Sequence, residues 1–192
     1  MDKEKTIIQA IYYLVKAKGS LDKRSALKLL FFADRYHLRR YGRMITKDTY
    51  YAMRNGAVPS LAKDLLKAGN IEIEKVVTDY RDKFLILLRE YDIEAVEEVK
   101  PDDLDHLSKS DIEALEFSLN NFGRFDSDRL WELTHIYPEW KRFERRFLED
   151  RNGREKILVD DFFEDSLIED DPFNTIPKDI VQINKEFYNG FF

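Results

Sequence analysis

The sequence predicts a mainly α-helical fold: a single helical domain around a buried central helix, with a small antiparallel β-hairpin or sheet packed against it. Apolar residues recur at helical spacing in several segments. The segment 22–41 is apolar round most of its circumference, which is typical of a helix that other elements cover on several sides. Only residues 49–53 and 71–100 contain short runs rich in strand-forming residues.

The size and composition fit one globular domain. The chain has 192 residues, of which 43% are hydrophobic and 14% aromatic, enough for a sizeable core. Cysteine is absent, which excludes disulfides, thiolate metal ligands and cysteine nucleophiles, and suits a reducing cytoplasm. We find no signal peptide and no run of about 18 apolar residues, so we expect a cytoplasmic protein without a membrane span.

The first two helices have recognisable ends. Apolar side chains at helical spacing predict a helix over residues 3–18, and Gly19 ends it. Asp22 is the predicted N-cap of the central helix, because an aspartate side chain accepts hydrogen bonds from the free N–H groups of the first turn. Gly42 is the predicted end of this helix, in the left-handed conformation that glycine adopts most easily.

Short strands and a third helix follow. Residues 49–53 predict a strand, Asn55 and Gly56 predict a turn, and Pro59 predicts the first position of a helix, where its missing N–H costs nothing. The apolar runs within 71–100 predict a small antiparallel sheet, to which the 49–53 strand is a candidate addition.

Helices dominate the second half of the chain. Ser108 and Asp111 match a capping box, which predicts a helix that ends at Gly123. Ser127 is the predicted cap of a short helix. Pro138 is predicted to open a further helix with aromatic residues on one face.

Three polar residues interrupt the apolar arc of the central helix. Asp34, His37 and Arg40 follow one another at three-residue steps. A buried polar group is costly unless it is paired and hydrogen-bonded, so these residues form either a structural network or a functional site. We favour a structural network in which Asp34 holds one tautomer of His37, and Arg40 pairs with a carboxylate elsewhere.

A narrow charged stripe runs along the same helix. Arg24, Lys28, Arg35 and Arg39 share it, and we interpret it as the solvated face of an otherwise buried helix. This interpretation explains the basic residues without a nucleic-acid site. We therefore expect no direct contact with nucleic acid.

Two acid-x-x-His pairs raise a catalytic alternative. Asp34 with His37, and Glu132 with His135, each place an acid and a histidine on one helical face, as in di-iron bundles. Two further bridging carboxylates would be needed, and no predicted helix presents them. We therefore expect no metal or cofactor, and expect His135 to bond a backbone carbonyl. Serine-hydrolase, P-loop, dinucleotide-binding and H-E-x-x-H motifs are absent, so we predict no enzymatic activity.

The negative charge is concentrated near the C-terminus. The net charge is −6, and residues 159–173 contain seven acids and no base, so the rest of the chain is nearly balanced. We divide the chain here into a body, residues 1–158, and an acidic, aromatic C-terminal segment, residues 159–192. The segment would repel nucleic acid and attract a basic protein.

An ordered set of motifs resembles the Panacea domain of the SocA-like antitoxin family. The resemblance covers roughly residues 5–150, although Ala57 stands where the family often has proline. In order, the motifs are LLFFADRYHLRRYGR at 29–43, TKDTY at 46–50, NGAVP at 55–59, WELTH at 131–135 and PEW at 138–140. The individual residues that match the family pattern, called the family-motif residues below, are Asp34, His37, Arg40, Tyr41, Gly42, Asp48, Tyr50, Met53, Gly56, Pro59, Trp131, His135 and Trp140.

The resemblance implies a non-catalytic antitoxin of a two-gene toxin–antitoxin system. Such a protein would neutralise a cognate toxin by direct protein–protein binding, which we expect to occlude the active site of the toxin. The resemblance also implies an alternative, a proteolytic adaptor that delivers the toxin to a bacterial ATP-dependent protease. An alternative from another class is a metal-dependent enzyme built on the two acid-x-x-His pairs.

The C-terminal segment has two interpretations. It is either a solvated tail or a decoy for the basic cleft of a toxin that acts on RNA, with aromatic anchors and carboxylates that steer association. Phe187, Tyr188, Phe191 and Phe192 indicate that the end of the chain either docks on the body or meets a partner. The candidate toxin-binding residues are Asp160, Asp161, Phe162, Phe163, Glu164, Asp165, Asp170, Asp171 and Phe173.

Overall fold

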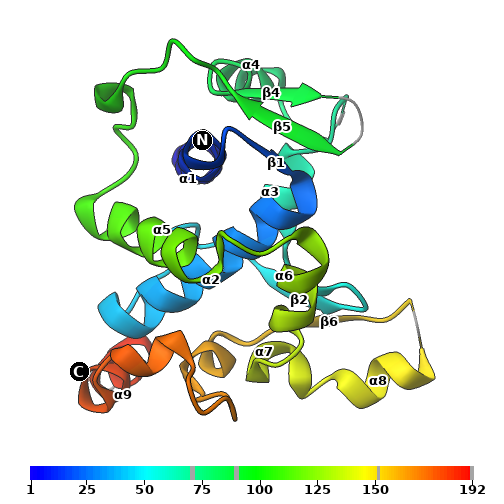
Figure 1. Ribbon diagram of the computed structural model, residues 1–192, viewed down its shortest axis with the longest axis vertical. Helices are drawn as coiled ribbons and strands as arrows, with labels where there is room; N and C mark the ends of the chain where they lie inside the picture. Colours follow the sequence, from blue (N-terminus) through cyan, green and yellow to red (C-terminus); the bar gives the residue numbers. More distant parts are fainter. Residues whose placement is uncertain (70–71, 89–90, 151, 191–192) are drawn as a thin grey trace.

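The computed structural model describes residues 1–69, 72–88, 91–150 and 152–190. Within these residues, helices and short strands surround one long helix, α2 (Figure 1). The α-helices are α1 (Asp2–Lys18), α2 (Lys23–Tyr41), α3 (Ser60–Leu65), α4 (Lys75–Arg81), α5 (Lys109–Phe122), α6 (Ser127–Thr134), α7 (Pro138–Lys141), α8 (Glu144–Glu149) and α9 (Lys178–Tyr188). The strands are β1 (Ser20–Asp22), β2 (Tyr50–Met53), β3 (Gly56–Pro59), β4 (Leu85–Leu88), β5 (Asp92–Ala95) and β6 (Arg154–Lys156). The 3-10 helices are η1 (Pro101–Asp103), η2 (Val159–Phe163) and η3 (Pro172–Thr175).

The predicted mainly α-helical class is wrong, because the described residues contain two three-stranded antiparallel sheets beside the helices. The fold is helix-rich but mixed α/β. Each strand has only three or four residues, too few for a clear alternating pattern. Two of the strands, β1 and β6, lie where the sequence predicted none, since they pair with partners far along the chain.

The two sheets are separate in the described residues. One has the strand order β1-β5-β4 and the other β3-β2-β6, so the 49–53 strand does not join the predicted sheet within 71–100. β2 and β3 form a hairpin whose register pairs Met53 with Gly56, which confirms the predicted turn. Pro59 ends β3 and directly precedes α3, one residue before its predicted position.

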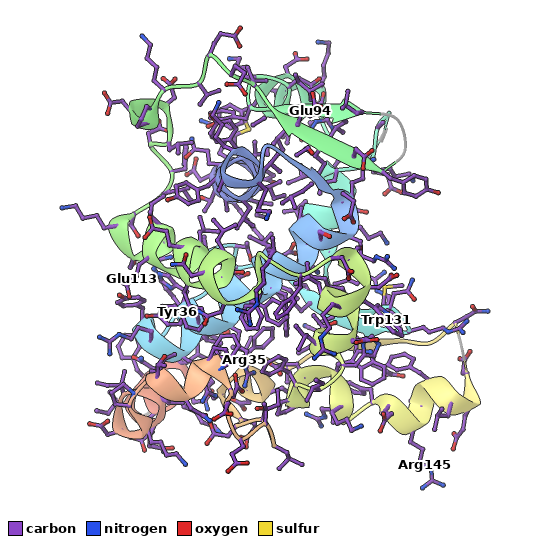
Figure 2. All side chains as sticks on the ribbon, viewed as in Figure 1. Arg35, Tyr36, Glu94, Glu113, Trp131 and Arg145 are labelled. Carbon is purple, nitrogen blue, oxygen red and sulfur yellow. The ribbon has the colours of Figure 1, made fainter. Side chains whose placement is uncertain are left out.

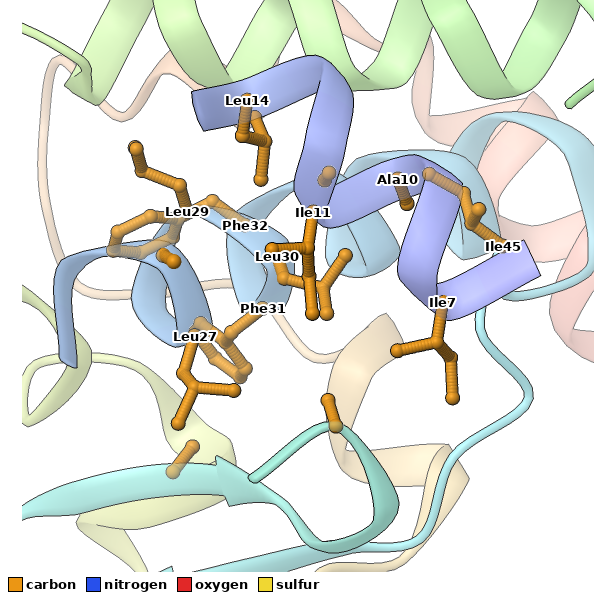
Figure 3. Close-up of a cluster of buried hydrophobic side chains, with 14 of the residues drawn as sticks. Ile7, Ala10, Ile11, Leu14, Leu27, Leu29, Leu30, Phe31, Phe32 and Ile45 are labelled. Atoms are coloured by element: carbon orange, nitrogen blue, oxygen red, sulfur yellow. The ribbon is translucent and has the colours of Figure 1, made fainter. Parts of the chain in front are cut away.

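The central helix lies in the middle of the molecule, as predicted. α5 packs along it, α1 crosses it, and α9 and η2 lie beside its C-terminal half (Figure 1). Figure 3 shows Ile11 of α1 next to Leu30 of α2, with Ile7 of α1 and Phe31 of α2 to either side, and all four side chains are fully buried. Burying each side chain of this size contributes about 1.5–3 kcal/mol, so the α1–α2 contact is a main source of stability.

Most helix ends follow the predictions. The Asp22 side chain accepts a hydrogen bond from a backbone N–H of the first turn of α2 (2.9 Å), and Gly42 adopts the left-handed conformation at φ 72° and ψ 9°. Ser108 begins α5 with the predicted capping box. The predicted cap Ser127 is wrong by one residue, because the side chain of Asp126 accepts the capping hydrogen bond.

Candidate functional site

The charged stripe of α2 faces the interior. Lys28, Arg35 and Arg39 are 2%, 0% and 2% exposed, whereas Arg24 at the start of the helix is exposed. The interpretation of this stripe as a solvated face is therefore wrong. Figure 2 shows Arg35 in the interior between α2 and the C-terminal segment, while Arg145 of α8 extends into solvent. The β2–β3 hairpin, α7 and the C-terminal segment cover the stripe.

Arg35 links α2 to α7 and to the C-terminal segment. Its guanidinium forms an ion pair with Glu139 of α7, and both side chains are fully buried. It also donates to the backbone carbonyl of Glu164 (2.6 Å) and lies 4.7 Å and 5.0 Å from the ring centroids of Tyr137 and Phe173. Burial raises the pKa of Glu139, and the charge of Arg35 opposes that rise. These contacts fix α7 and the segment relative to α2.

Arg39 holds the C-terminal segment by its backbone. Its guanidinium donates to the carbonyls of Phe163 (2.5 Å) and Glu164 (3.1 Å) and to the carboxylate of Asp165 (2.5 Å). The side chain of Asn184 in α9 donates to the carbonyl of Arg39 (2.9 Å). Burial acts to raise the pKa of Asp165, but the hydrogen bond and charge of Arg39 hold it below its usual value. Charge-assisted hydrogen bonds are the stronger kind, so the segment is firmly docked.

The candidate toxin-binding residues divide into a buried and an exposed group. The buried group is Asp161, Phe162, Phe163, Asp171 and Phe173. The exposed group is Asp160, Glu164, Asp165 and Asp170. In this conformation the aromatic residues anchor the segment to the body, and only the exposed carboxylates are available to a partner.

α9 adds exposed apolar residues to the C-terminal segment. Val181 packs inward at 8% exposed, whereas Ile183 and Phe187, four residues apart, are 50% and 65% exposed. Residues at this spacing lie on one face of a helix. α9 therefore docks on the body by one face and presents an apolar face to solvent. Phe191 and Phe192 lie outside the described residues.

The polar residues of the central helix do not form the predicted network. Asp34 accepts hydrogen bonds from the backbone N–H of Thr46 (3.0 Å) and the hydroxyl of Tyr50 (2.8 Å). His37 instead lies between a carbonyl of the loop after α2 (Nδ1, 2.7 Å) and the carboxylate of Asp111 (Nε2, 3.1 Å). The predicted Asp34–His37 contact is wrong, because that loop folds back along α2 and supplies nearer partners to both residues.

Two carboxyl groups in this region, those of Asp34 and Asp111, have shifted pKa values. Burial raises the pKa of Asp34 to about 6, against the opposing hydrogen bonds from its partners. Burial also acts to raise the pKa of Asp111, but hydrogen bonds from His37 and Ser108 hold it well below its usual value. Arg40 is half-buried, with its guanidinium 5.9 Å from the ring centroid of Tyr41. These contacts close the loop after α2 onto the helix.

Further family-motif residues join short elements to one another. The carboxylate of Asp48 accepts hydrogen bonds from the backbone N–H groups of Leu61 (3.1 Å) and Ala62 (2.9 Å), so it caps α3. The indole of Trp140 in α7 donates to the carbonyl of Met53 in β2 (2.6 Å). Each contact gives a hydrogen-bond partner to backbone groups at the end of a short helix or strand.

The two acid-x-x-His pairs do not converge on one site. His135 Nδ1 lies 2.6 Å from the carbonyl of Trp131, which confirms its predicted carbonyl partner, and Nε2 lies 3.0 Å from the carbonyl of Arg54; a neutral imidazole donates to one of the two. Glu132 accepts a hydrogen bond from Arg129 (2.8 Å). Among the described residues, no group of three histidine or acidic side chains is placed to hold a metal ion.

Lys28 is a buried charge that the sequence reasoning missed. Its Nζ donates to the carbonyls of Asn55 (2.6 Å) and Ala57 (2.9 Å) at the tip of the β2–β3 hairpin. Burial, and then the charge of Arg24, lowers the pKa of Lys28 to about 7. Gly56 lies between those carbonyls at φ +89°, and a Cβ there would come within 2.6 Å of Lys28 Nζ. Helical periodicity gives no signal that a hairpin would cover this lysine.

The match to known families places the protein in an antitoxin class. The family model described as "Antitoxin SocA-like, Panacea domain" matches residues 27–141, more than half of the chain. The chain therefore belongs to the SocA-like Panacea domain family. The match runs from α2 to α7 and contains every family-motif residue, whereas the segment 159–192 lies beyond it. No curated protein and no solved structure matches the chain.

Family membership supports an antitoxin role and implies a cognate toxin as partner. In the part of the chain that the structure describes, none of the helices combines the length and apolar character needed to cross a membrane.

Proposed function

We propose that this protein neutralises its cognate toxin in the cytoplasm by direct binding, and that the exposed side chains of its docked C-terminal segment occlude a basic cleft of the toxin. The observation that carries the proposal is the presence, on one segment, of exposed carboxylates and an exposed apolar pair. We call these residues the C-terminal surface: Asp160, Glu164, Asp165, Asp170, Ile183 and Phe187.

The carboxylates give this surface a negative field. Glu164 pairs with Lys185 (2.7 Å) and Asp165 with Arg39, but Asp170 has no ion pair among the described residues. Negative charge at an interface accelerates association with a basic partner and makes the affinity depend on salt.

The apolar pair supplies anchors. Ile183 and Phe187 are exposed on one face of α9, and apolar side chains at this spacing are how a helix binds in a partner's groove. Exposed aromatic residues often carry a large share of binding energy. Because Arg39 and Asn184 already hold the segment in place, its ordering costs little further entropy when the toxin binds.

The product of the adjacent gene is the toxin to test. Its expression alone should stop growth, and co-expression with this chain should restore growth and yield a complex that co-purifies. The double variant I183E/F187E should lose both effects. The matched control is Leu148→Glu, an apolar residue of α8 that is 80% exposed and lies outside the C-terminal surface. Both variants change exposed residues, so their unfolding free energies should stay within about 0.5 kcal/mol per site.

Two measurements separate occlusion of the toxin from its delivery to a protease. The dissociation constant of the complex should rise with salt, and Asp170→Asn should weaken binding at low salt but not at high salt. Neutralisation should persist in a host that lacks its ATP-dependent proteases, with the toxin still present, since occlusion needs no degradation. Full protection by I183E/F187E would overturn the C-terminal surface as the toxin site. Loss of the toxin only in hosts that contain the protease would favour the adaptor role.

A further inference from the structure

Among the described residues, β4 is an unpaired edge of its sheet. In the described residues, the order β1-β5-β4 leaves one side of β4 unpaired, and Figure 1 shows this strand beyond β5 at the outside of the sheet. Edge strands are usually blunted by charged residues, proline or a covering element. All four residues of β4 are leucine or isoleucine, and Ile86 is 43% exposed. An edge of this kind is a template for a further strand.

The backbone groups that face outwards follow from the hydrogen bonds. The N–H of Val96 donates to the carbonyl of Phe84 (2.9 Å), directly opposite in the β4–β5 register. Bonded pairs alternate along an antiparallel ladder, so the even-numbered residues of β4 bond to β5. Leu85 and Leu87 therefore direct their N–H and C=O groups to the free side. On the other side of β5, the carbonyl of Tyr91 accepts a hydrogen bond from the β1 side. Odd-numbered residues of β5 therefore face β1, and even-numbered residues face β4.

A groove of about 370 Å³ lies beside β4. It is open at Gly69, where a Cβ would meet no atom within 4 Å. The guanidinium of Arg81 is buried and already bonds the carbonyl of Leu65 (2.9 Å) and the carboxylate of Asp82. A ligand in the groove therefore needs no negative charge to pair with Arg81. The residues that line it are Ala68, Gly69, Arg81, Asp82, Leu85, Ile86 and Leu87.

The flanks of this groove are basic. Lys67 directly precedes Ala68 in the groove lining, and Lys83 lies two residues before Leu85. Both lysines are exposed, and neither ammonium group has a partner among the described residues. A ligand that carries carboxylates at its ends would match this charge.

We propose that the free edge of β4 binds an extended segment of a partner protein by strand addition. The segment pairs its backbone with Leu85 and Leu87, places an apolar side chain beside Ile86, and carries acids near Lys67 and Lys83. Main-chain hydrogen bonds give affinity in this mode, and alternate side chains give specificity. This site is separate from the C-terminal surface and does not depend on it.

A peptide segment fits the edge better than a second copy of this chain does. A second copy would bring its own Lys67 and Lys83 to an edge that already carries these two exposed lysines, whereas acids on a peptide would complement them. A second copy is therefore treated as an outcome of the test.

The test uses a phage-displayed library of random dodecapeptides selected on the intact chain. Enriched peptides should alternate apolar residues and contain acids. The variant Ile86→Lys should weaken their binding by about tenfold or more, since it places a charge on the edge. The matched control is Val76→Lys, which changes an apolar residue of α4 that is 52% exposed and should alter affinity less than about twofold.

Backbone methylation of a selected peptide gives a second readout that a side-chain site would not show. Methylating alternate amide nitrogens should weaken binding by about tenfold, and methylating the intervening ones should not, because only alternate N–H groups face β4. The proposal is overturned if no peptide is enriched, if Ile86→Lys and Val76→Lys bind equally, or if methylation shows no alternation. A wild-type dimer in sedimentation that Ile86→Lys dissolves would assign the edge to a second copy instead.

Discussion

The guanidinium of Arg35 and the carboxylate of Glu139 form an ion pair in which neither side chain is exposed, although the two residues are 104 positions apart in the chain. The pair ties α7 to α2 at the place where the C-terminal segment crosses both helices. Removing water from two charges is costly, and their attraction offsets that cost only while both partners are present.

We predict that Arg35→Met destabilises the protein by about 3–5 kcal/mol, because it leaves the buried carboxyl group of Glu139 without its guanidinium partner. The double variant R35M/E139L should recover most of that loss, since it buries no charge. Urea unfolding of the wild type, both single variants and the double variant measures the coupling. Additive effects of the two single substitutions would show that the pair does not act as a unit.

The Arg35 pair also shows what sequence reasoning reached and what it missed. Helical periodicity correctly placed Arg35 and Arg39 on one stripe of α2, but it cannot tell whether a stripe is solvated or covered. The covering groups, Glu139 and the carbonyl of Phe163, lie 104 and 124 residues away. Local signals fared better: the caps at Asp22 and Gly42 were predictable because the hydrogen bonds that form them join residues only three and four positions apart.

The strands and the C-terminal segment illustrate the same limit. A three-residue strand such as β1 or β6 is defined by its partner and has no pattern of its own. In the segment, the run of acids indicated a solvated or partner-bound surface. However, Phe162 and Phe173 are each 1% exposed and Asp171 is buried with them, whereas Glu164, Asp165 and Asp170 are exposed. That division depends on a docking face that only the folded body provides.

Arg39→Met should loosen the C-terminal segment while leaving the body folded. The substitution removes the donors that hold the carbonyls of Phe163 and Glu164, and each lost hydrogen bond to a charged group costs about 1.5–3 kcal/mol. Hydrogen exchange of the backbone amides in residues 162–188 should therefore accelerate by about tenfold or more. Arg40→Met is the matched control, since Arg40 is half-buried beside Tyr41. Equal acceleration in both variants would contradict the anchoring role of Arg39.

Deleting residues 159–192 should lower the stability of the remaining body. Phe162 packs 5.6 Å from Phe31 and 5.3 Å from Tyr50 between ring centroids, and these contacts would be lost to water. Re-exposing a buried phenylalanine costs about 1.5–3 kcal/mol. The division into a 1–158 body and a C-terminal segment stays a prediction, and the melting temperature of the truncated chain tests it. An unchanged melting temperature would show that the body folds independently.

Asp34 should make the stability depend on pH in a defined window. Burial raises its pKa from 3.8 to about 6, so between these values the folded state binds more protons than the unfolded state. The contribution of Asp34 is therefore greatest at low pH and is lost as the pH rises to 6. The unfolding free energy of the wild type minus that of Asp34→Asn should fall by about 3 kcal/mol across this window and then level off. A flat difference would show that the pKa of Asp34 is not raised.

Two glycines with positive φ separate conformational strain from steric crowding. Gly56 and Gly19 have φ values of +89° and +80°, so alanine at either position adopts an unfavourable left-handed conformation that costs about 1–2 kcal/mol. At Gly19 a Cβ would meet no atom within 4 Å, whereas at Gly56 it would lie 2.3 Å from Thr134 Oγ1 and 2.6 Å from Lys28 Nζ. Gly56→Ala should therefore cost about 1–3 kcal/mol more than Gly19→Ala in urea unfolding. Equal losses would mean that the hairpin tip shifts freely away from Lys28, which the two hydrogen bonds from that buried lysine to the tip argue against.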